Sequence, residues 1–164
     1  MTGTQLTAVF SGTSSGISSS NVLVFPGAKE RILISDPTAD WSDVVKKRLE
    51  ELIHLPLGWD GYQATHVSFQ NANFALRVLE AICGVKTCAP QIVPGISGDL
   101  QIEWHTLQGD LEIHVIGPNN VRAWRTKVGG NPEGEELILR NDFSTVAQWV
   151  NEITEPSIAA AAAA

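Results

Sequence analysis

The sequence predicts an α+β fold. The expected architecture is an antiparallel sheet, a meander of three to five strands plus N-terminal strands, packed against two central helices and a short C-terminal helix. Three observations predict it: two central segments repeat apolar residues at helical spacing, the stretch from 91 to 140 alternates apolar and polar residues between turn signals, and the 164 residues, 43% of them hydrophobic, suit one core. Helices that are segregated along the chain from an antiparallel sheet define this class.

The first 35 residues are poor in helix formers. Short apolar runs at 6–10, 22–25 and 31–34 predict two or three strands, and residues 11–20 are almost wholly Ser, Gly and Thr, the composition of a flexible loop. We therefore expect a β-rich N-terminal arm over 1–35. The alternative is a largely disordered tail up to about residue 20.

A single α+β domain is expected to follow over residues 36–156. The first helix has Asp40 as its predicted N-cap and Pro56 as its stop. A second helix is predicted from about Ser68 to Ile82. The residues that recur at helical spacing in the first helix and make up its mainly apolar stripe are Trp41, Val44, Val45, Arg48, Leu49, Leu52 and Ile53. The alanine run over 159–164 is unlike the rest of the chain, so 157–164 is treated as a tail outside the fold.

The second half of the domain is rich in strand signals. Strands are predicted over 91–93, 100–105, 110–116, 121–127 and 135–140, and Ser144 is the predicted cap of the last short helix. The strands carry their own turns, among them a loop with Gly109 and the Pro118-Asn119-Asn120 turn. Successive strands are therefore expected to pair as hairpins.

The loops fix a strand register that the structure can test. A loop over 106–109 places Glu103 opposite Glu112, and a loop over 117–120 places Ile113 opposite Trp124 and Glu112 opposite Arg125. The predicted core face then comprises Ile102, Trp104, Leu111, Ile113 and Trp124. The opposite face carries Gln101, Glu103, Glu112, His114 and Arg125. Like charges directly across a strand pair repel, and Arg125 is expected to offset this repulsion.

Four polar residues on these strands are candidates for a metal site: Glu103, His105, Glu112 and His114. Carboxylate and imidazole ligands suit zinc or manganese. An open sheet face is solvated, however, and no helix-borne ligand pair accompanies the four residues. We therefore favour an ordinary solvated face with no metal and no cofactor.

The segment between the two helices is the most distinctive in the chain. It reads Gly58-Trp59-Asp60-Gly61-Tyr62, in which the two glycines permit positive φ and a sharp turn. One interpretation is a rigid corner with Asp60 as its internal cap. The other is a recognition surface, since Trp and Tyr supply many interface hot spots. Trp59, Asp60 and Tyr62 are the candidate binding residues for a protein partner.

This corner, the segment Pro90-Gln91-Ile92-Val93-Pro94 and the stretch from Gly98 to Trp104 resemble a loose family of small uncharacterised bacterial and phage proteins. Its members share a Gly-Trp-Asp-Gly-Tyr corner, a Pro-flanked β segment and a strand with Gly…Glu-Trp. The resemblance covers roughly residues 45–150. It implies a setting on mobile elements near toxin–antitoxin or phage-defence genes and implies no reaction.

Composition narrows the function classes. A net charge of −7 disfavours nucleic-acid binding, and the one dense basic run, 46–48, has acidic neighbours.

Cys83 and Cys88 without a second pair disfavour a zinc site, and we expect both thiols to be reduced in a cytoplasmic protein. The apolar runs are too short to span a bilayer. The sequence has no Gly-rich phosphate loop, Gly-x-Ser-x-Gly or His-Glu-x-x-His, so an enzyme is the less favoured reading.

Three functional hypotheses follow, and each leaves self-association open. The leading one is a non-catalytic regulator of the antitoxin, immunity or anti-defence type, whose acidic surface suits a basic protein partner. The second is a structural subunit of a larger phage or defence assembly, in which the N-terminal arm pairs with a neighbour. The third is a metal-assisted hydrolase that uses the four polar strand residues.

Overall fold

The computed structural model describes residues 31–154. The elements within this range are, in chain order, α1 (Ser42–Ile53), α2 (Phe69–Ile82), β1 (Gln91–Pro94), β2 (Leu100–Thr106), β3 (Gly109–Gly117), β4 (Asn120–Lys127), β5 (Glu135–Leu139) and α3 (Ser144–Thr154). The five strands pair antiparallel in the order β1-β2-β3-β4-β5, which is the predicted meander. The α+β class is confirmed. The predicted strands at 6–10 and 22–25, the loop at 11–20 and the tail at 157–164 lie outside the described residues.

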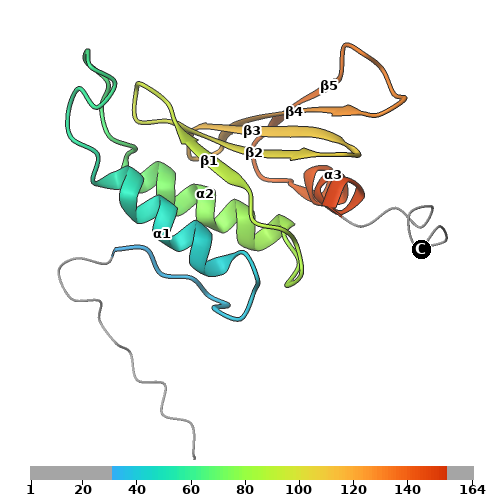
Figure 1. Ribbon diagram of the computed structural model, residues 1–164, viewed down its shortest axis with the longest axis horizontal. Coiled ribbons are helices and arrows are strands. Elements are labelled where there is room, and N and C mark those ends of the chain that lie inside the picture. The colour runs from blue at the N-terminus through green and yellow to red at the C-terminus, as the bar shows by residue number, and fades with distance from the viewer. Residues whose placement is uncertain (1–30, 155–164) are drawn as a thin grey trace, which may run out of the picture.

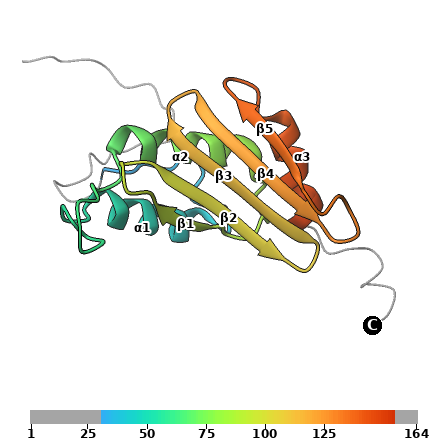
Figure 2. The ribbon, with the colours of Figure 1, turned by 90° about the horizontal axis from the view of Figure 1, so that it is seen from above.

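The helices of residues 31–154 form a layer on one side of the sheet. Figure 1 shows α1, α2 and α3 beneath the sheet, and Figure 2, looking onto the sheet, shows its other face uncovered by any described element. Helix α1 contacts β1, α2 contacts β3, and α3 contacts β3 and β4. Fully buried side chains from both layers form the core, among them Val45, Leu49, Leu76, Leu79, Leu100, Ile102, Leu111, Ile113, Val146 and Val150. Each large aliphatic side chain buried there contributes about 1.5–3 kcal/mol to stability.

Residues 31–34 do not form the predicted strand. The segment runs along the side of the helices that faces away from the sheet (Figure 1), so α1 and α2 separate it from every strand. Its backbone N–H groups bond to helix carboxylates instead: Arg31 and Ile32 donate to Glu50, and Ser35 donates to Glu80 at 2.7 Å. Ile32 is only 1% exposed, so the core begins within the segment that the sequence assigned to the arm.

The predicted N-termini of the helices agree with the structure only in part. Helix α2 begins next to Ser68, as predicted, and Ser68 is its N-cap, because its hydroxyl accepts from the Asn71 N–H at 3.0 Å. Asp40 does not cap α1: the helix begins one residue later with no side-chain cap, and the Asp40 carboxylate pairs with Lys86 instead. Val44, placed in the apolar stripe of α1, is 56% exposed. At the start of α3, the carboxylate of Asp142 accepts from the Ser144 N–H, so Asp142 takes the capping role predicted for Ser144.

The strand register is confirmed in the first hairpin and wrong in the second. Glu103 lies opposite Glu112, as predicted. Gly117 and Asn120 close the next turn, but a β-bulge at Ile116 then shifts the pairing by one residue. A one-residue shift moves every later side chain to the opposite face. Ile113 therefore faces Ala123, Glu112 faces Trp124 and Leu111 faces Arg125.

This shift corrects two predictions. Trp124 is not in the core: it lies on the uncovered face, where its indole N–H is 3.4 Å from the Glu133 carbonyl. Arg125 is not on the uncovered face and offsets no repulsion there. It is 7% exposed on the helix-covered face, where its guanidinium stacks on Trp149.

Candidate functional site

The corner between α1 and α2 is a locked loop. The Asp60 carboxylate accepts from the backbone N–H groups of Tyr62, at 2.9 Å, and Ala64, at 3.2 Å. The Trp59 indole N–H donates to the Thr65 carbonyl at 2.9 Å. Gly58 has φ of +72°, and a Cβ there would lie 2.9 Å from the Tyr62 carbonyl oxygen. The interpretation of Asp60 as an internal cap of the corner is thus confirmed.

The three candidate binding residues are differently placed within this loop. Trp59 and Asp60 are partly buried, and their polar groups form hydrogen bonds within the loop itself. Tyr62 is 86% exposed, and nearby Leu57 is 77% exposed. The polar groups of Trp59 and Asp60 therefore hold the shape of the corner, while Tyr62 stands out from it.

A second loop, which joins β1 to β2, is fastened to the corner. The Thr65 N–H donates to the Ile96 carbonyl at 3.0 Å, and Thr65 forms an isolated parallel bridge with Ser97. The buried Asn71 side chain donates to the Gly98 carbonyl at 2.8 Å and so holds this loop to the start of α2. Ile96 is 66% exposed. These bonds place it on the same end of the molecule as the corner.

We call the exposed side chains of Leu57, Tyr62 and Ile96 the corner surface. Sequence reasoning found Tyr62 but missed the other two. An isoleucine within the Pro94-Gly95-Ile96-Ser97-Gly98 turn was the available signal, since such a turn has little cover for an apolar side chain. No local sequence pattern predicts the backbone pairing between the two loops.

The four candidate metal ligands lie on the uncovered face but do not converge. The His105 ring contacts the Asp110 carboxylate at 2.9 Å and the Glu103 carboxylate at 3.4 Å, and these two hydrogen bonds, in that order, raise the pKa of His105. The Nε2 atom of His114 instead lies 2.6 Å from the Asp99 carboxylate. Within residues 31–154 no group of three or more His, Cys, Asp or Glu residues is arranged to hold a metal ion.

The contact between His114 and Asp99 braces the loop between β1 and β2. Burial raises the pKa of Asp99, but hydrogen bonds from His114 and from backbone N–H groups outweigh it, so the net pKa is lowered. The Asp99 carboxylate packs closely on Gly95, where a Cβ would approach it to 2.2 Å. This pair has a structural use near the corner surface, because it fixes the loop that presents Ile96.

The two cysteines have different surroundings and both carry free thiols. Burial, and secondarily the neighbouring Cys88, raises the pKa of the Cys83 thiol to about 12. Cys88 is exposed. Since the thiolate is the reactive form, Cys83 is inert and Cys88 is the accessible thiol.

No protein-family model, curated protein or solved structure matches the chain. Among the helices of residues 31–154, none has the length and apolar character needed to cross a membrane. The described residues present an α+β domain with a sheet face that no other described element covers and a rigid, partly apolar corner at one end.

Proposed function

We propose that the protein is a non-catalytic regulator that binds one protein partner through the corner surface, as an antitoxin, immunity protein or anti-defence inhibitor does. The observation that carries the proposal is the exposure of Tyr62, at 86%, on a loop whose backbone is fixed by Asp60. Tyrosine is enriched among the residues that dominate binding energy. A loop that is ordered before binding loses little conformational entropy when the partner docks.

The partner is expected to be basic. The chain has a net charge of −7, and complementary charge accelerates association and excludes wrong partners. The genetic setting, on mobile elements beside toxin–antitoxin or phage-defence genes, comes from the family resemblance of the corner and the strands that follow.

The test compares two double variants, each of which truncates two exposed apolar side chains. Leu57→Ala/Tyr62→Ala truncates two of the three corner-surface side chains, 77% and 86% exposed, whereas Val44→Ala/Ile138→Ala truncates two exposed apolar side chains, 56% and 72% exposed, on α1 and β5. Loss of a tyrosine hot spot weakens binding by at least about 30-fold. We expect this loss of affinity for the protein partner in Leu57→Ala/Tyr62→Ala alone, with both variants folded as judged by circular dichroism. Equal affinity of the two variants for the partner would contradict the proposal.

Substitutions of Trp59 and Asp60 are expected to affect stability as well as binding. Because their side chains hold the corner, Trp59→Ala or Asp60→Ala is expected to lower the stability of the corner as well as binding. Hydrogen exchange of the corner amides separates the two effects, since Tyr62→Ala should leave that exchange unchanged.

A further inference from the structure

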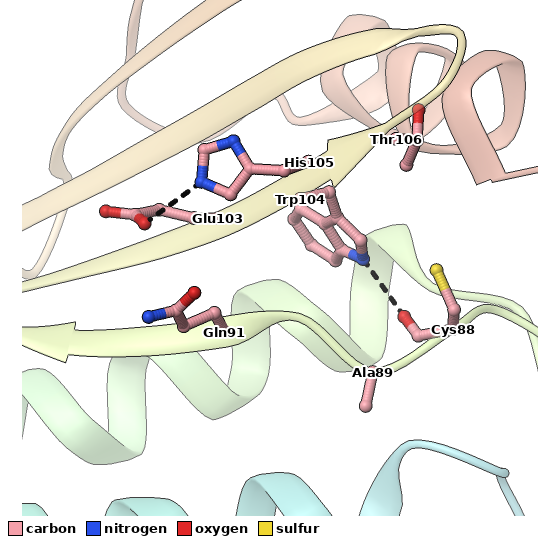
Figure 3. A pocket seen from close by; sticks show the side chains of 7 residues that line it. All are labelled: Cys88, Ala89, Gln91, Glu103, Trp104, His105 and Thr106. Carbon is pink, nitrogen blue, oxygen red and sulfur yellow. Dashed lines mark hydrogen bonds and ion pairs between the residues drawn. The ribbon is translucent and has the colours of Figure 1, made fainter.

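The uncovered face of the sheet ends in a pocket beside β1. Its volume is about 230 Å³, and Figure 3 shows side chains from β1, β2 and residues 88–89 around it. It exists because β1 is shorter than β2: the first residue of β1, Gln91, pairs with Glu103, so Trp104–Thr106 extend past the end of β1. Pockets for drug-sized ligands measure roughly 300–1,000 Å³. This one has room for a single long side chain.

The pocket offers one incompletely paired carboxylate. One oxygen of Glu103 lies 3.4 Å from the His105 ring, and the other accepts no hydrogen bond from residues 31–154 (Figure 3). On the adjacent strand Glu112 lies directly opposite, and no described residue forms a hydrogen bond or ion pair with it. Two carboxylates across a strand pair repel. A cation brought to this position would relieve that repulsion.

The remaining walls suit a long cationic side chain. Trp104 also lines the pocket, but only with the small exposed part of its ring, which is 3% exposed because the side chain points to the helix-covered side of β2; its indole N–H donates to the Cys88 carbonyl at 3.0 Å. The exposed Gln91 side chain at the rim forms no hydrogen bond with the described residues, so its amide oxygen is free to accept one. A free amide and a carboxylate match the planar fork of an arginine, which pairs with a carboxylate through two parallel hydrogen bonds.

We propose that this pocket, hereafter the Glu103 pocket, receives an arginine side chain of the protein partner. The inference rests on the proposed function, which it deepens by giving the basic partner a specific contact. Strand β2 runs from the loop that presents Ile96 to the Glu103 pocket, and seven strand residues span about 23 Å. One partner of ordinary interface size, about 800 Å² on each side, can therefore span Ile96 of the corner surface and the pocket.

The test uses a small probe, so that it does not depend on finding the partner. N-acetyl-L-arginine methylamide is titrated into the ¹⁵N-labelled full chain, beside the citrulline analogue, which has the same shape and no charge. We expect saturable shifts at the Trp104 indole N–H and the Gln91 amide, at least tenfold weaker binding of citrulline, and a similar loss in Glu103→Gln. Glu136→Gln is the matched control, because Glu136 lies on the same face in edge strand β5, opposite Trp124 and away from the pocket.

Three results would overturn the assignment. They are equal binding of citrulline and arginine, an equal loss in Glu136→Gln, and shifts spread over the whole sheet face, which would indicate a general acidic field. The two proposals fail separately. If a partner is captured through the corner surface but the pocket does not bind arginine, only the arginine-pocket proposal is refuted. If the pocket binds arginine but no protein partner is found, the regulator proposal is refuted.

Discussion

The buried guanidinium of Arg125 makes the strongest stability prediction. It stacks on the Trp149 ring at 4.3 Å from the centroid, and it donates to Glu152 at 2.7 Å and to Glu135 at 3.1 Å. Lys127 also pairs with Glu152. These contacts tie α3 to β4 and β5. Arg125→Met keeps the length and apolar character of the side chain and removes the charge, so it isolates the polar contacts.

The magnitude follows from these contacts. A charge-assisted hydrogen bond to Glu152 contributes about 1.5–3 kcal/mol and the cation–π contact about 0.5–2 kcal/mol. Glu135 is 54% exposed in its side chain, and a pair this open contributes about 0–1 kcal/mol. Methionine avoids the cost of desolvating the guanidinium, which offsets part of the loss. The net expectation is a destabilisation of about 2 kcal/mol, or a Tm lower by about 8 °C for a domain of this size.

The assay is urea and thermal unfolding of the full chain, followed by circular dichroism. Arg122→Met is the matched control, because Arg122 lies on the same strand, is exposed, and has no ion pair or hydrogen bond with any part of the chain that the structure describes. Its change should stay within about 0.5 kcal/mol. If Arg125→Met were no more destabilising than Arg122→Met, the net stabilising role of the Arg125 contacts would be refuted.

The same cluster predicts a pH dependence. Hydrogen bonds from Lys127 and, against the cost of burial, from Arg125 lower the pKa of Glu152 from 4.5 to about 2. A carboxylate whose pKa is depressed on folding stabilises the fold above its unfolded pKa, and that stabilisation is lost as the pH falls towards the folded value. The stability gap between wild type and Arg125→Met should therefore narrow between pH 4.5 and about 2. A constant gap across that window would contradict the role of Glu152.

Three further predictions concern single groups. A thiol reagent at neutral pH should modify Cys88 quickly and Cys83 only on unfolding, because burial raises the pKa of Cys83 to about 12; two equally fast thiols would contradict this. NMR titration should give His105 a pKa above 6.5, and Asp110→Asn should lower it, since the Asp110 carboxylate is the largest cause of the shift. Glu112→Gln should raise stability by about 0.2–1 kcal/mol in urea unfolding, because it removes a like-charge pair across the first hairpin; a loss of stability would mean that this carboxylate has a favourable contact.

Sequence reasoning succeeded where local chemistry decides the structure. The first hairpin follows from alternation on both strands and a short loop before Gly109, and its register is confirmed through Glu103 and Glu112. The corner was also readable, because glycines and an aspartate in a five-residue turn have few ways to satisfy their backbone groups. The start of α2 next to Ser68 was likewise predicted, since the apolar repeat begins there.

It failed where one residue or a distant contact decides. A bulge at Ile116 leaves the alternation pattern intact on either side, so the sequence does not reveal that Trp124 and Arg125 exchange faces. Residues 31–34 look like a strand, yet the N–H groups of Arg31 and Ile32 donate to the Glu50 carboxylate of α1. The Glu103 pocket depends on residues 88–89 lying beside the end of β2, a placement that only the folded chain shows.

The most direct test of the central claim is an affinity capture of the tagged full chain from its source cells, with mass spectrometry of what co-purifies. Wild type, Leu57→Ala/Tyr62→Ala and Val44→Ala/Ile138→Ala are compared side by side. The account predicts one stoichiometric basic protein that is retained by wild type and the control and lost by the corner variant. Retention by all three, or a chain that self-assembles or stays alone, would contradict a regulator that binds through the corner surface.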